Sequence, residues 1–469
     1  MNDNIRRASI FFLVSFLILV LNLTYFQIVV ADTVAGHPRN TRAIQSEMQI
    51  ERGRIFDRNG LMLADNDKVG LEYRRRYPFD DLTSGITGFN SVRFGRSGLE
   101  ESFNKYLLGK KKVASFEEYL ARLREEPRGH DVWLTLDTRV QEAAAEALED
   151  RTGAVVAIDP RSGELIAAVT FPRYNPNTVE ADWAVLSKDP GKPLFNRATQ
   201  GLYPPGSTFK IITAAAALEA GLASPTKTYT GPNELRVHGG KVTNYAGQGC
   251  GTLTLAGAFA KSCNTIFAQI GLELEAERLV RFARRFGLDK RVDLEVRTSQ
   301  STIPNAGEMD PLDLAWSSVG QGRTLVTPVQ MGMIGAAIAG NGRIYEPRLV
   351  KEVRDRKGHT LLRPAAKVFA QPLLASEALA VRELMVQTVE AGTGLRAKIA
   401  GVTVGGKTGT AEPADKKRTH AWFVGFAPAE NPEIVVAVIV EHAGEGGRVA
   451  APIAKRVMEE ALGLASSSE

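Results

Sequence analysis

An unbroken apolar stretch near the N-terminus places the strongest constraint on this chain. Residues 8–30 are apolar except for Ser9, Ser15, Asn22, Thr24 and Gln27. At about 1.5 Å per residue, a helix of this length crosses the ~30 Å hydrocarbon core of a membrane. Arg6 and Arg7 precede the stretch and favour a cytoplasmic start, with the rest of the chain outside. A cleaved signal peptide ending near Ala31 is the alternative, but its apolar core would be shorter, so we expect an uncleaved anchor.

The bulk composition limits what else the chain can be. Its 469 residues leave room for two or three domains and at least one large core. The hydrophobic fraction of 44% and the charged fraction of 24% are typical of a globular protein. A net charge of +5, spread along the chain, is too weak to indicate nucleic-acid binding. Two cysteines in so long a chain exclude a disulfide-rich scaffold.

Residues 31–135 are typical of a small non-catalytic domain. Asn59-Gly60 tolerates positive φ at both positions and predicts a hairpin turn between two short strands in residues 52–64. A helix is expected over residues 96–108, followed by a solvated helical segment up to about residue 126. The region lacks the density of reactive side chains that an active site needs.

Residues 136–465 combine strands at both ends with helices between them. Asp137 is expected to cap a helix over residues 138–149. Strands are expected at residues 154–159, 165–169, 421–426 and 434–440, and helices at residues 208–221, 255–272, 275–286, 327–339 and 453–462. Because the strands come from opposite ends of the region, we expect one sheet with helices packed on it. This is an α+β architecture rather than a series of βαβ units.

The most informative short cluster is Ser207-Thr208-Phe209-Lys210. Pro204-Pro205-Gly206 marks a helix start, and Lys210 lies three residues after Ser207, so both side chains share one helix face. A serine hydroxyl becomes a nucleophile when a base takes its proton. An amine can be that base if burial or a nearby cation lowers its pKa. Taken alone, the motif is more often a capping serine with a solvated lysine.

Two further clusters contain residues suited to the same chemistry. In Ser262-Cys263-Asn264, Ser262 can relay a proton to a leaving amine, and Asn264 can hold a substrate amide or orient Lys210. In Lys407-Thr408-Gly409-Thr410, an expected edge strand, Gly409 lets a substrate backbone approach, and Lys407 and the threonine hydroxyls meet a carboxylate. Separately, a polar turn and a solvated strand end are the commoner interpretations. All three clusters in this order are far less frequent by chance.

The motif set S-x-x-K, S-D-N and K-T-G belongs to class A β-lactamases and penicillin-binding proteins. Here Cys263 replaces the central Asp, and the outer residues of that motif are intact. The chain resembles a class B penicillin-binding protein, a monofunctional peptidoglycan transpeptidase. The short chain, the Ser-Cys-Asn variant and residues 37–42 look most similar to the penicillin-binding protein A group of actinobacteria. Further segments that resemble the family are residues 52–64, 96–108, 193–198, 320–322 and 327–330.

The resemblance implies both a fold and a division of the chain. It implies an α+β, penicillin-binding/β-lactamase-like transpeptidase domain, with an antiparallel sheet, helices on both faces and an all-helical subdomain. One transmembrane helix and a small elongated pedestal, similar to a dimerisation domain, would precede it. The expected boundaries are residues 1–7 for a cytoplasmic N-terminus, 8–30 for the anchor, 31–135 for the pedestal and 136–465 for the transpeptidase domain.

The resemblance also implies a mechanism that agrees with the residues. Ser207 would attack the penultimate D-Ala carbonyl of a peptidoglycan stem peptide while Lys210 takes its proton. The backbone N–H groups of Ser207 and Thr410 would form the oxyanion hole. Ser262 would help to protonate the departing D-Ala, and the terminal carboxylate would be held by Lys407, Thr408 and Thr410. An amine of a second stem would then close the cross-link, and penicillin would acylate Ser207 and stay.

Several interpretations stay open at this point. Cys250 and Cys263 either form a disulfide around the second cluster or pack as two buried thiols. A D,D-carboxypeptidase, a β-lactamase and a non-catalytic penicillin-binding scaffold or sensor are the competing functions. No histidine spacing is typical of a metal site, and no cofactor is expected. The expected partners are peptidoglycan stem peptides, β-lactams, the cell membrane, a membrane glycosyltransferase that polymerises lipid II, and other division or elongation proteins.

Overall fold

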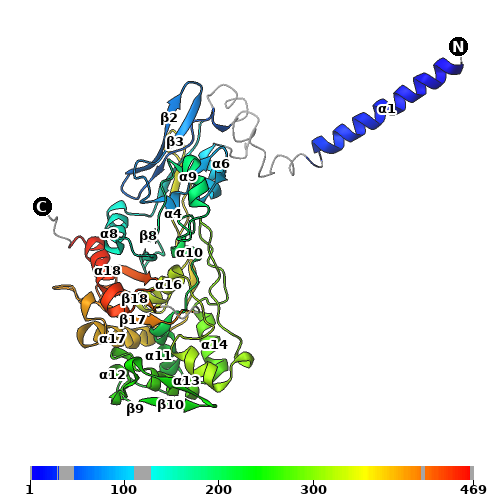
Figure 1. Cartoon of the computed structure of the whole chain (residues 1–469). Coiled ribbons are helices and arrows are strands. Elements are labelled where there is room, and N and C mark those ends of the chain that lie inside the picture. The colour runs from blue at the N-terminus through cyan, green and yellow to red at the C-terminus, as the bar shows by residue number, and fades with distance from the viewer. Residues whose placement is uncertain (1–2, 29, 31–46, 110–127, 414–417, 465–469) are drawn as a thin grey trace.

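A five-stranded antiparallel sheet forms the centre of the larger part of the molecule (Figure 1). The structure is a computed structural model, and it describes residues 3–28, 30, 47–109, 128–413 and 418–464. The strand order of the sheet is β17-β18-β19-β7-β8. The sheet therefore joins strands from both ends of the region, as the sequence predicts. The strands are β7 (Gly153–Ile158), β8 (Leu165–Phe171), β17 (Gly405–Ala411), β18 (His420–Ala427) and β19 (Ile434–Val440).

Helices cover both faces of this sheet, so its central strands are buried throughout (Figure 1). Along β19, alternate residues enter two different hydrophobic cores: Val435 and Ala437 enter one, and Val436 and Val438 the other. Helix α16 packs on the first face, and α8 and α18 pack together on the second. Their bounds are α8 (Thr138–Leu148), α16 (Pro328–Ala339) and α18 (Gly446–Ala461).

A mainly helical subdomain with two small two-stranded sheets lies at the end of the molecule opposite the pedestal (Figure 1). The expected helix over residues 255–272 is in fact two helices, because Ser262 adopts a positive φ of 59° that an α-helix cannot accommodate. The helices are α11 (Lys210–Glu219), α12 (Leu255–Ala260), α13 (Asn264–Leu274), α14 (Ala276–Arg285), α15 (Pro311–Ser318) and α17 (Ala375–Ala391). One sheet pairs β9 (Thr228–Gly231) with β12 (Gly251–Thr254), and the other is a hairpin of β10 (Glu234–Val237) and β11 (Gly240–Thr243).

The pedestal contains a second sheet, with the order β15-β14-β6-β1-β2-β3. The predicted turn at Asn59-Gly60 is confirmed: the Asp57 carboxylate accepts the N–H groups of Asn59 and Leu61, and Gly60 has a φ of 91°. Two strands of the sheet come from residues 350–362, so it draws on both sides of residue 135. The strands are β1 (Ile55–Phe56), β2 (Met62–Val69), β3 (Glu72–Arg76), β6 (Asp131–Leu134), β14 (Val350–Arg354) and β15 (Thr360–Leu362).

A buried ionic cluster holds the pedestal together. The Glu100 carboxylate, fully buried in α5 (Gly98–Ser102), binds Arg52 Nη2 at 2.6 Å and Arg75 Nε at 2.6 Å. Burial alone would raise the pKa of Glu100, but the two guanidinium groups outweigh it and lower that pKa. Short helices α4 (Ser84–Thr87) and α6 (Asn104–Leu107) lie next to α5 in the chain.

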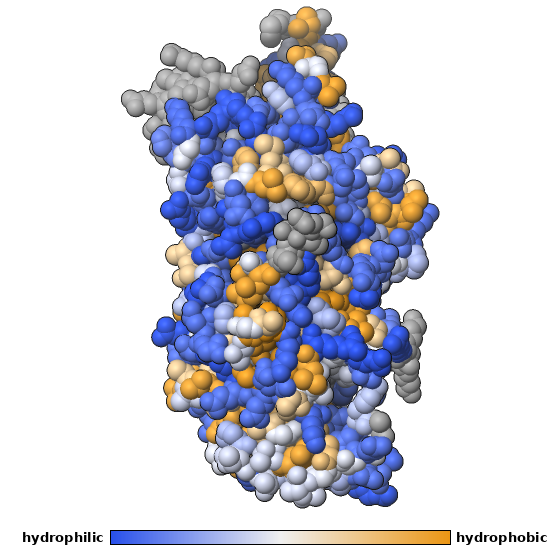
Figure 2. All heavy atoms as spheres, turned by 90° about the vertical axis from the view of Figure 1, so that its left-hand side faces the viewer, coloured by the Kyte–Doolittle hydropathy of each residue, from blue (hydrophilic) through white to orange (hydrophobic). Residues whose placement is uncertain are grey.

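The N-terminal helix α1 (Asp3–Ile28) extends away from both parts of the molecule (Figure 1). It is long and apolar enough to cross a membrane, and its side chains are unburied. On the face drawn in Figure 2, hydrophobic residues form small groups separated by hydrophilic ones. The similarity of residues 37–42 and the expected helical segment up to residue 126 fall largely outside the described residues.

Candidate active site

The turn that presents Ser207 is fixed by its neighbours. Residues Gly206–Phe209 form a 3₁₀ turn that leads into α11, and Ser207 is half-buried there. Gly206 has a φ of 52°, and a Cβ at this position would lie 2.8 Å from the Thr410 carbonyl oxygen. Its N–H donates to the Gly320 carbonyl at 2.8 Å. The turn therefore requires glycine and brings Ser207 beside strand β17.

Lys210 is a fully buried amine held by oxygen acceptors. Its Nζ lies 2.7 Å from the Ser262 carbonyl oxygen, 2.7 Å from Asn264 Oδ1 and 3.3 Å from Ser262 Oγ. Burial, with a smaller effect from the charge of Lys407, lowers its pKa well below the ordinary lysine value. A neutral amine has two hydrogens, which the two acceptors at 2.7 Å can take. Its lone pair is then left to accept a proton.

The Ser262-Cys263-Asn264 segment aims these acceptors at Lys210. The left-handed backbone of Ser262 turns the chain between α12 and α13, which directs both its carbonyl and its hydroxyl to the amine. Asn264 donates its Nδ2 to the Thr243 carbonyl at 3.0 Å, so Oδ1 faces Lys210. In the structure Cys263 is joined to Cys250 by a disulfide, which ties this segment to the chain just before β12.

Lys407, on strand β17, also contacts Ser262. It is fully buried, and its Nζ donates to Ser262 Oγ at 3.0 Å and to the Thr408 carbonyl at 3.0 Å. Burial lowers the pKa of Lys407 to about 7. The Ser262 hydroxyl therefore lies between two buried amines, of which Lys407 can lose its proton near neutral pH.

Strand β17 is the edge strand that the sequence predicts, and it closes one side of the site. The Thr408 hydroxyl bonds the Thr393 hydroxyl at 2.6 Å. A Cβ on Gly409 would lie 3.0 Å from Thr208 Cγ2 and 3.1 Å from the Pro205 carbonyl oxygen. The close approach that Gly409 allows in this structure is thus to the turn that presents Ser207.

The candidate residues meet around a pocket of about 450 Å³. Ser207, Ser262, Asn264, Thr408 and Thr410 line it, whereas Lys210, Lys407 and Gly409 lie behind its wall. Three sequence clusters that lie far apart in the chain thus come together at one surface. The arrangement provides a hydroxyl, an amine of lowered pKa and a second hydroxyl positioned between two amines, which suits acyl transfer.

Several residues that build this site lie outside the three sequence clusters. Gln321 donates its Nε2 to the Thr410 carbonyl at 3.2 Å and accepts the Glu412 N–H at 3.3 Å, which supports the free edge of β17. Across the pocket, the Tyr245 hydroxyl donates to Glu445 Oε1 at 3.0 Å. For Gln321 the sequence offers one indication, the resemblance of Gly320-Gln321-Gly322 to the family. No sequence pattern indicates the contact between Tyr245 and Glu445, because they lie 200 positions apart.

Two family models match this chain. Residues 153–459 match the penicillin binding protein transpeptidase domain, and residues 52–132 match the penicillin binding protein A dimerisation domain. The chain belongs to the penicillin-binding protein family. The predicted α+β transpeptidase fold is therefore confirmed, together with the similarity to the penicillin-binding protein A group.

Relatives of this penicillin-binding protein extend over nearly its whole length. The peptidoglycan D,D-transpeptidase PbpA of Mycolicibacterium smegmatis is 34% identical over 98% of this chain and 99% of its own. PbpA of Mycobacterium tuberculosis is 36% identical over the same shares. Among solved structures, a ceftriaxone acyl-enzyme complex of M. tuberculosis penicillin-binding protein A has a TM-score of 0.84 at 34% identity, over 89% of this chain and 99% of that one.

Proposed function

We propose that this penicillin-binding protein is a peptidoglycan D,D-transpeptidase that works through an acyl-enzyme on Ser207. The observation that carries the assignment is Lys210: an amine of lowered pKa, fully buried one helical turn from the serine. A lysine that served only as a surface charge would keep its solvation and its ordinary pKa. The similarity to the mycobacterial D,D-transpeptidases and to the ceftriaxone acyl-enzyme complex supports the same activity.

Acylation begins with proton transfer from Ser207 to Lys210. The neutral Nζ takes the hydroxyl proton as Oγ bonds to the carbonyl carbon of the penultimate D-Ala in the donor stem. The carbonyl oxygen becomes an oxyanion, which the backbone N–H groups of Ser207 and Thr410 stabilise. Both residues line the pocket, and the Thr410 carbonyl lies against Gly206, next to the nucleophile.

Collapse of this intermediate expels the terminal D-Ala as an amine that needs a proton. The Ser262 hydroxyl donates it and is reprotonated by the Lys210 ammonium, since its Oγ lies 3.3 Å from Lys210 Nζ and 3.0 Å from Lys407 Nζ. In its protonated form Lys407 places a positive charge beside the terminal carboxylate of the donor. The hydroxyls of Thr408 and Thr410 bind the same carboxylate.

The acyl group then passes to an amine of a second stem peptide. That amine attacks the ester carbon, its proton goes to Lys210, and Ser207 leaves with the proton returned to Oγ. Asn264 holds Lys210 in place through both halves of the reaction. A β-lactam acylates Ser207 by ring opening, which leaves no small leaving group to depart and make room for an acceptor.

The test of the nucleophile is the Ser207→Ala variant, labelled with a fluorescent penicillin. We expect labelling to disappear, and the matched control Ser224→Ala, at an exposed serine, to label like the wild type. Undiminished labelling of Ser207→Ala would refute the assignment. A donor stem peptide offered together with a D-amino acid then separates the activities: exchange indicates a transpeptidase, and net hydrolysis indicates a D,D-carboxypeptidase.

We propose that the anchor spans the membrane once and leaves the catalytic part outside the cell. Arg6 and Arg7 set this orientation. Residues 1–7, 8–30, 31–135 and 136–465 are the proposed cytoplasmic end, anchor, pedestal and transpeptidase domain. A lipid II-polymerising glycosyltransferase is the proposed partner, in division or cell-shape synthesis. Photo-crosslinking from residues 52–60 in cells tests this, and capture of no membrane glycosyltransferase would contradict it.

A further inference from the structure

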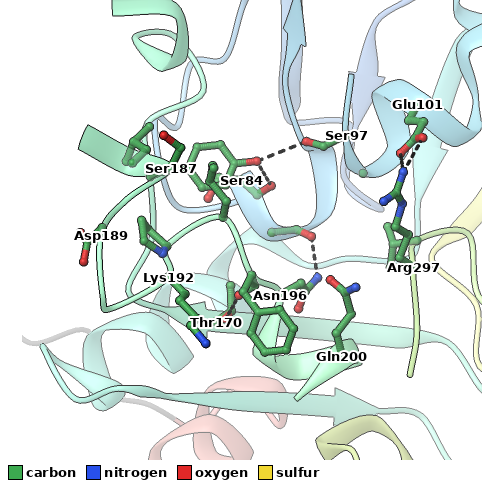
Figure 3. Close-up of a pocket in the computed structure, with 18 of the residues that line it drawn as sticks. Ser84, Ser97, Glu101, Thr170, Ser187, Asp189, Lys192, Asn196, Gln200 and Arg297 are labelled. Atoms are coloured by element: carbon green, nitrogen blue, oxygen red, sulfur yellow. Dashed lines mark hydrogen bonds and ion pairs between the residues drawn. The ribbon is translucent and has the colours of Figure 1, made fainter. Parts of the chain in front are cut away.

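A second cavity, of about 450 Å³, lies where the pedestal meets the transpeptidase part (Figure 3). We call it the seam pocket and define it by six of its lining residues: Ser97, Tyr174, Ser187, Lys192, Phe195 and Gln200. It shares no lining residue with the pocket of Ser207. Its volume is in the range of pockets that bind small ligands.

Three polar side chains of the seam pocket have no partner among the described residues. The amide of Gln200, the hydroxyl of Ser187 and the ammonium of Lys192 make no hydrogen bond to that part of the chain. Figure 3 shows Gln200, Ser187 and Lys192 on the green ribbon of the transpeptidase part, and Ser84 and Ser97 on the pale blue ribbon of the pedestal, with the Lys192 side chain directed away from these two serines. The pocket therefore offers free donors and acceptors to a ligand.

Other polar groups of the seam pocket are fixed by the protein itself. The Tyr174 hydroxyl donates to the Ser84 carbonyl at 3.2 Å and lies 3.5 Å from Ser97 Oγ. Asn196 donates its Nδ2 to the Gly85 carbonyl at 2.7 Å. These bonds join the two parts of the molecule, so the cavity wall is already formed without a ligand.

The charges of the seam pocket do not favour an anion. Arg297 is paired with Glu101 at 2.8 Å, and Arg96 is paired with Glu47. Lys192 is the remaining cation, and it is balanced by Asp189 on the same lining. A phosphate or polyanion site would carry an excess of positive charge. The ligand that fits is therefore uncharged and rich in hydrogen-bonding groups.

An apolar lining next to these polar groups narrows the ligand class further. Leu186, Leu194, Phe195 and Val296 line the cavity together with the ring of Tyr174. Sugar rings have C–H faces that pack on such side chains and edges of hydroxyl and acetamido groups that hydrogen-bond. A lining with both features suits a carbohydrate better than a peptide side chain or a lipid tail.

We propose that the seam pocket binds the glycan strand of peptidoglycan, as an uncharged run of N-acetylated amino sugars. The inference rests on the proposed function, because its ligand is the polymer that carries the reacting stem peptides. Binding at the seam would hold the strand while a stem reaches Ser207, and two attachment points raise the effective concentration of the stem.

The segment that connects the seam pocket to Ser207 is held in place by contacts with the rest of the protein, so the two sites keep a fixed relative position. From the seam pocket it runs through α10 (Arg197–Gln200) to the nucleophile turn. The Glu441 carboxylate binds Arg197 Nε at 2.8 Å and the Tyr203 hydroxyl at 2.7 Å. Trp422 Nε1 donates to the Pro204 carbonyl at 3.0 Å. The contacts of Tyr203 and Pro204 thus fix the six residues between Gln200 and Ser207, and that of Arg197 fixes the helix before them.

The test measures glycan binding to the full-length protein in detergent, with Ser207 first acylated by penicillin. The probe is chitotetraose, with the longer neutral chitohexaose as the second probe, and calorimetry gives Kd. We expect saturable binding that Gln200→Ala and Lys192→Ala each weaken about five- to tenfold. Lys188→Ala, at an exposed lysine outside the pocket lining, is the matched control and should bind like the wild type.

Each outcome decides the proposal. No binding to either probe overturns it, and so does an unchanged Kd in the Gln200→Ala/Lys192→Ala double variant. Tighter binding of an anionic wall polymer than of the neutral glycan overturns the ligand class. Ser187→Trp, which fills the cavity from an exposed position, should abolish binding while its unfolding temperature shows that it is folded. If penicillin fails to acylate Ser207, the proposed function fails, and the same titration of unlabelled protein still tests the seam pocket.

Discussion

Two buried clusters of ionisable side chains among the described residues have opposite designs. In the pedestal, the carboxylate of Glu100 lies between the guanidinium groups of Arg52 and Arg75. In the active site, Lys210 and Lys407 share the hydroxyl of Ser262, and oxygens of neutral groups are their hydrogen-bond partners. The first cluster pairs opposite charges, and the second brings two amines together.

This difference separates structural from chemical roles. In the pedestal the two guanidinium groups lower the pKa of Glu100, so the carboxylate keeps its charge and the ion pairs persist. In the active site burial lowers the pKa of both lysines, and no carboxylate of the described residues raises it again. A buried amine without a counter-charge gives up its proton easily, and this makes it available as a base.

Lys210→Arg should give the largest effect, because it preserves the charge but not the ability to lose a proton. Arginine stays protonated in proteins, so Ser207 would have no base. We expect the second-order rate constant for acylation by a fluorescent penicillin to fall about 10³-fold or more, since base and nucleophile act as a unit. Lys227→Arg, at an exposed lysine, is the control. If the acylation rate constant of Lys210→Arg fell less than tenfold, Lys210 would not be the base, and the contrast between the two clusters would be wrong.

Glu100→Gln should have the largest effect on stability in the pedestal. The substitution leaves Arg52 and Arg75 buried without their carboxylate, which should cost about 3–5 kcal/mol of unfolding free energy. Urea unfolding followed by tryptophan fluorescence measures this, with Trp133 in β6 as a local reporter.

The neighbouring Glu101→Gln is the control for this loss. Glu101 is half-exposed and pairs with the exposed Arg297, so its loss should cost about 1 kcal/mol or less. Under native conditions Glu100→Gln should acylate at a rate close to that of the wild type. If it instead lost acylation as completely as Lys210→Arg, the two clusters would not have separate roles.

Lys407→Met should have a smaller effect, seen in the pH dependence. The wild-type acylation rate should rise with pH as the Lys210 ammonium loses its proton, and then level off. The charge of Lys407 helps to lower the pKa of Lys210, so its removal raises that pKa. The rising limb should therefore move to higher pH in Lys407→Met. A limb that stays in place, or moves to lower pH, would show that the two amines are not coupled.

Features set by local chemistry were predicted from the sequence. The Asn59-Gly60 turn and the helix capped by Asp137 depend on adjacent residues, and both are present in the structure. The antiparallel sheet followed from apolar strands at both ends of the region. The motif pattern placed Ser207, Lys210, Ser262 and Lys407 in one site because their order is informative even where their geometry is not.

Features set by distant contacts could not be predicted. The helix expected over residues 255–272 breaks at Ser262, whose left-handed backbone the helical pattern does not reveal. The Thr408–Thr393 and Gln321–Thr410 bonds join segments that the motifs do not connect. Strand β14 pairs with β6 of the pedestal from more than 200 positions away, and no periodicity encodes such a pairing.

The shared pedestal sheet has a consequence for how the protein is made. Strands β1, β2, β3 and β6 leave the ribosome early, but β14 and β15 follow only after most of the catalytic part has been synthesised. Until then the edge of β6 has no partner and can pair with other chains. The pedestal sheet is therefore completed late, although its first strands are translated early. A deletion of residues 350–362 would therefore leave β6, which is encoded far upstream, without its partner strand β14.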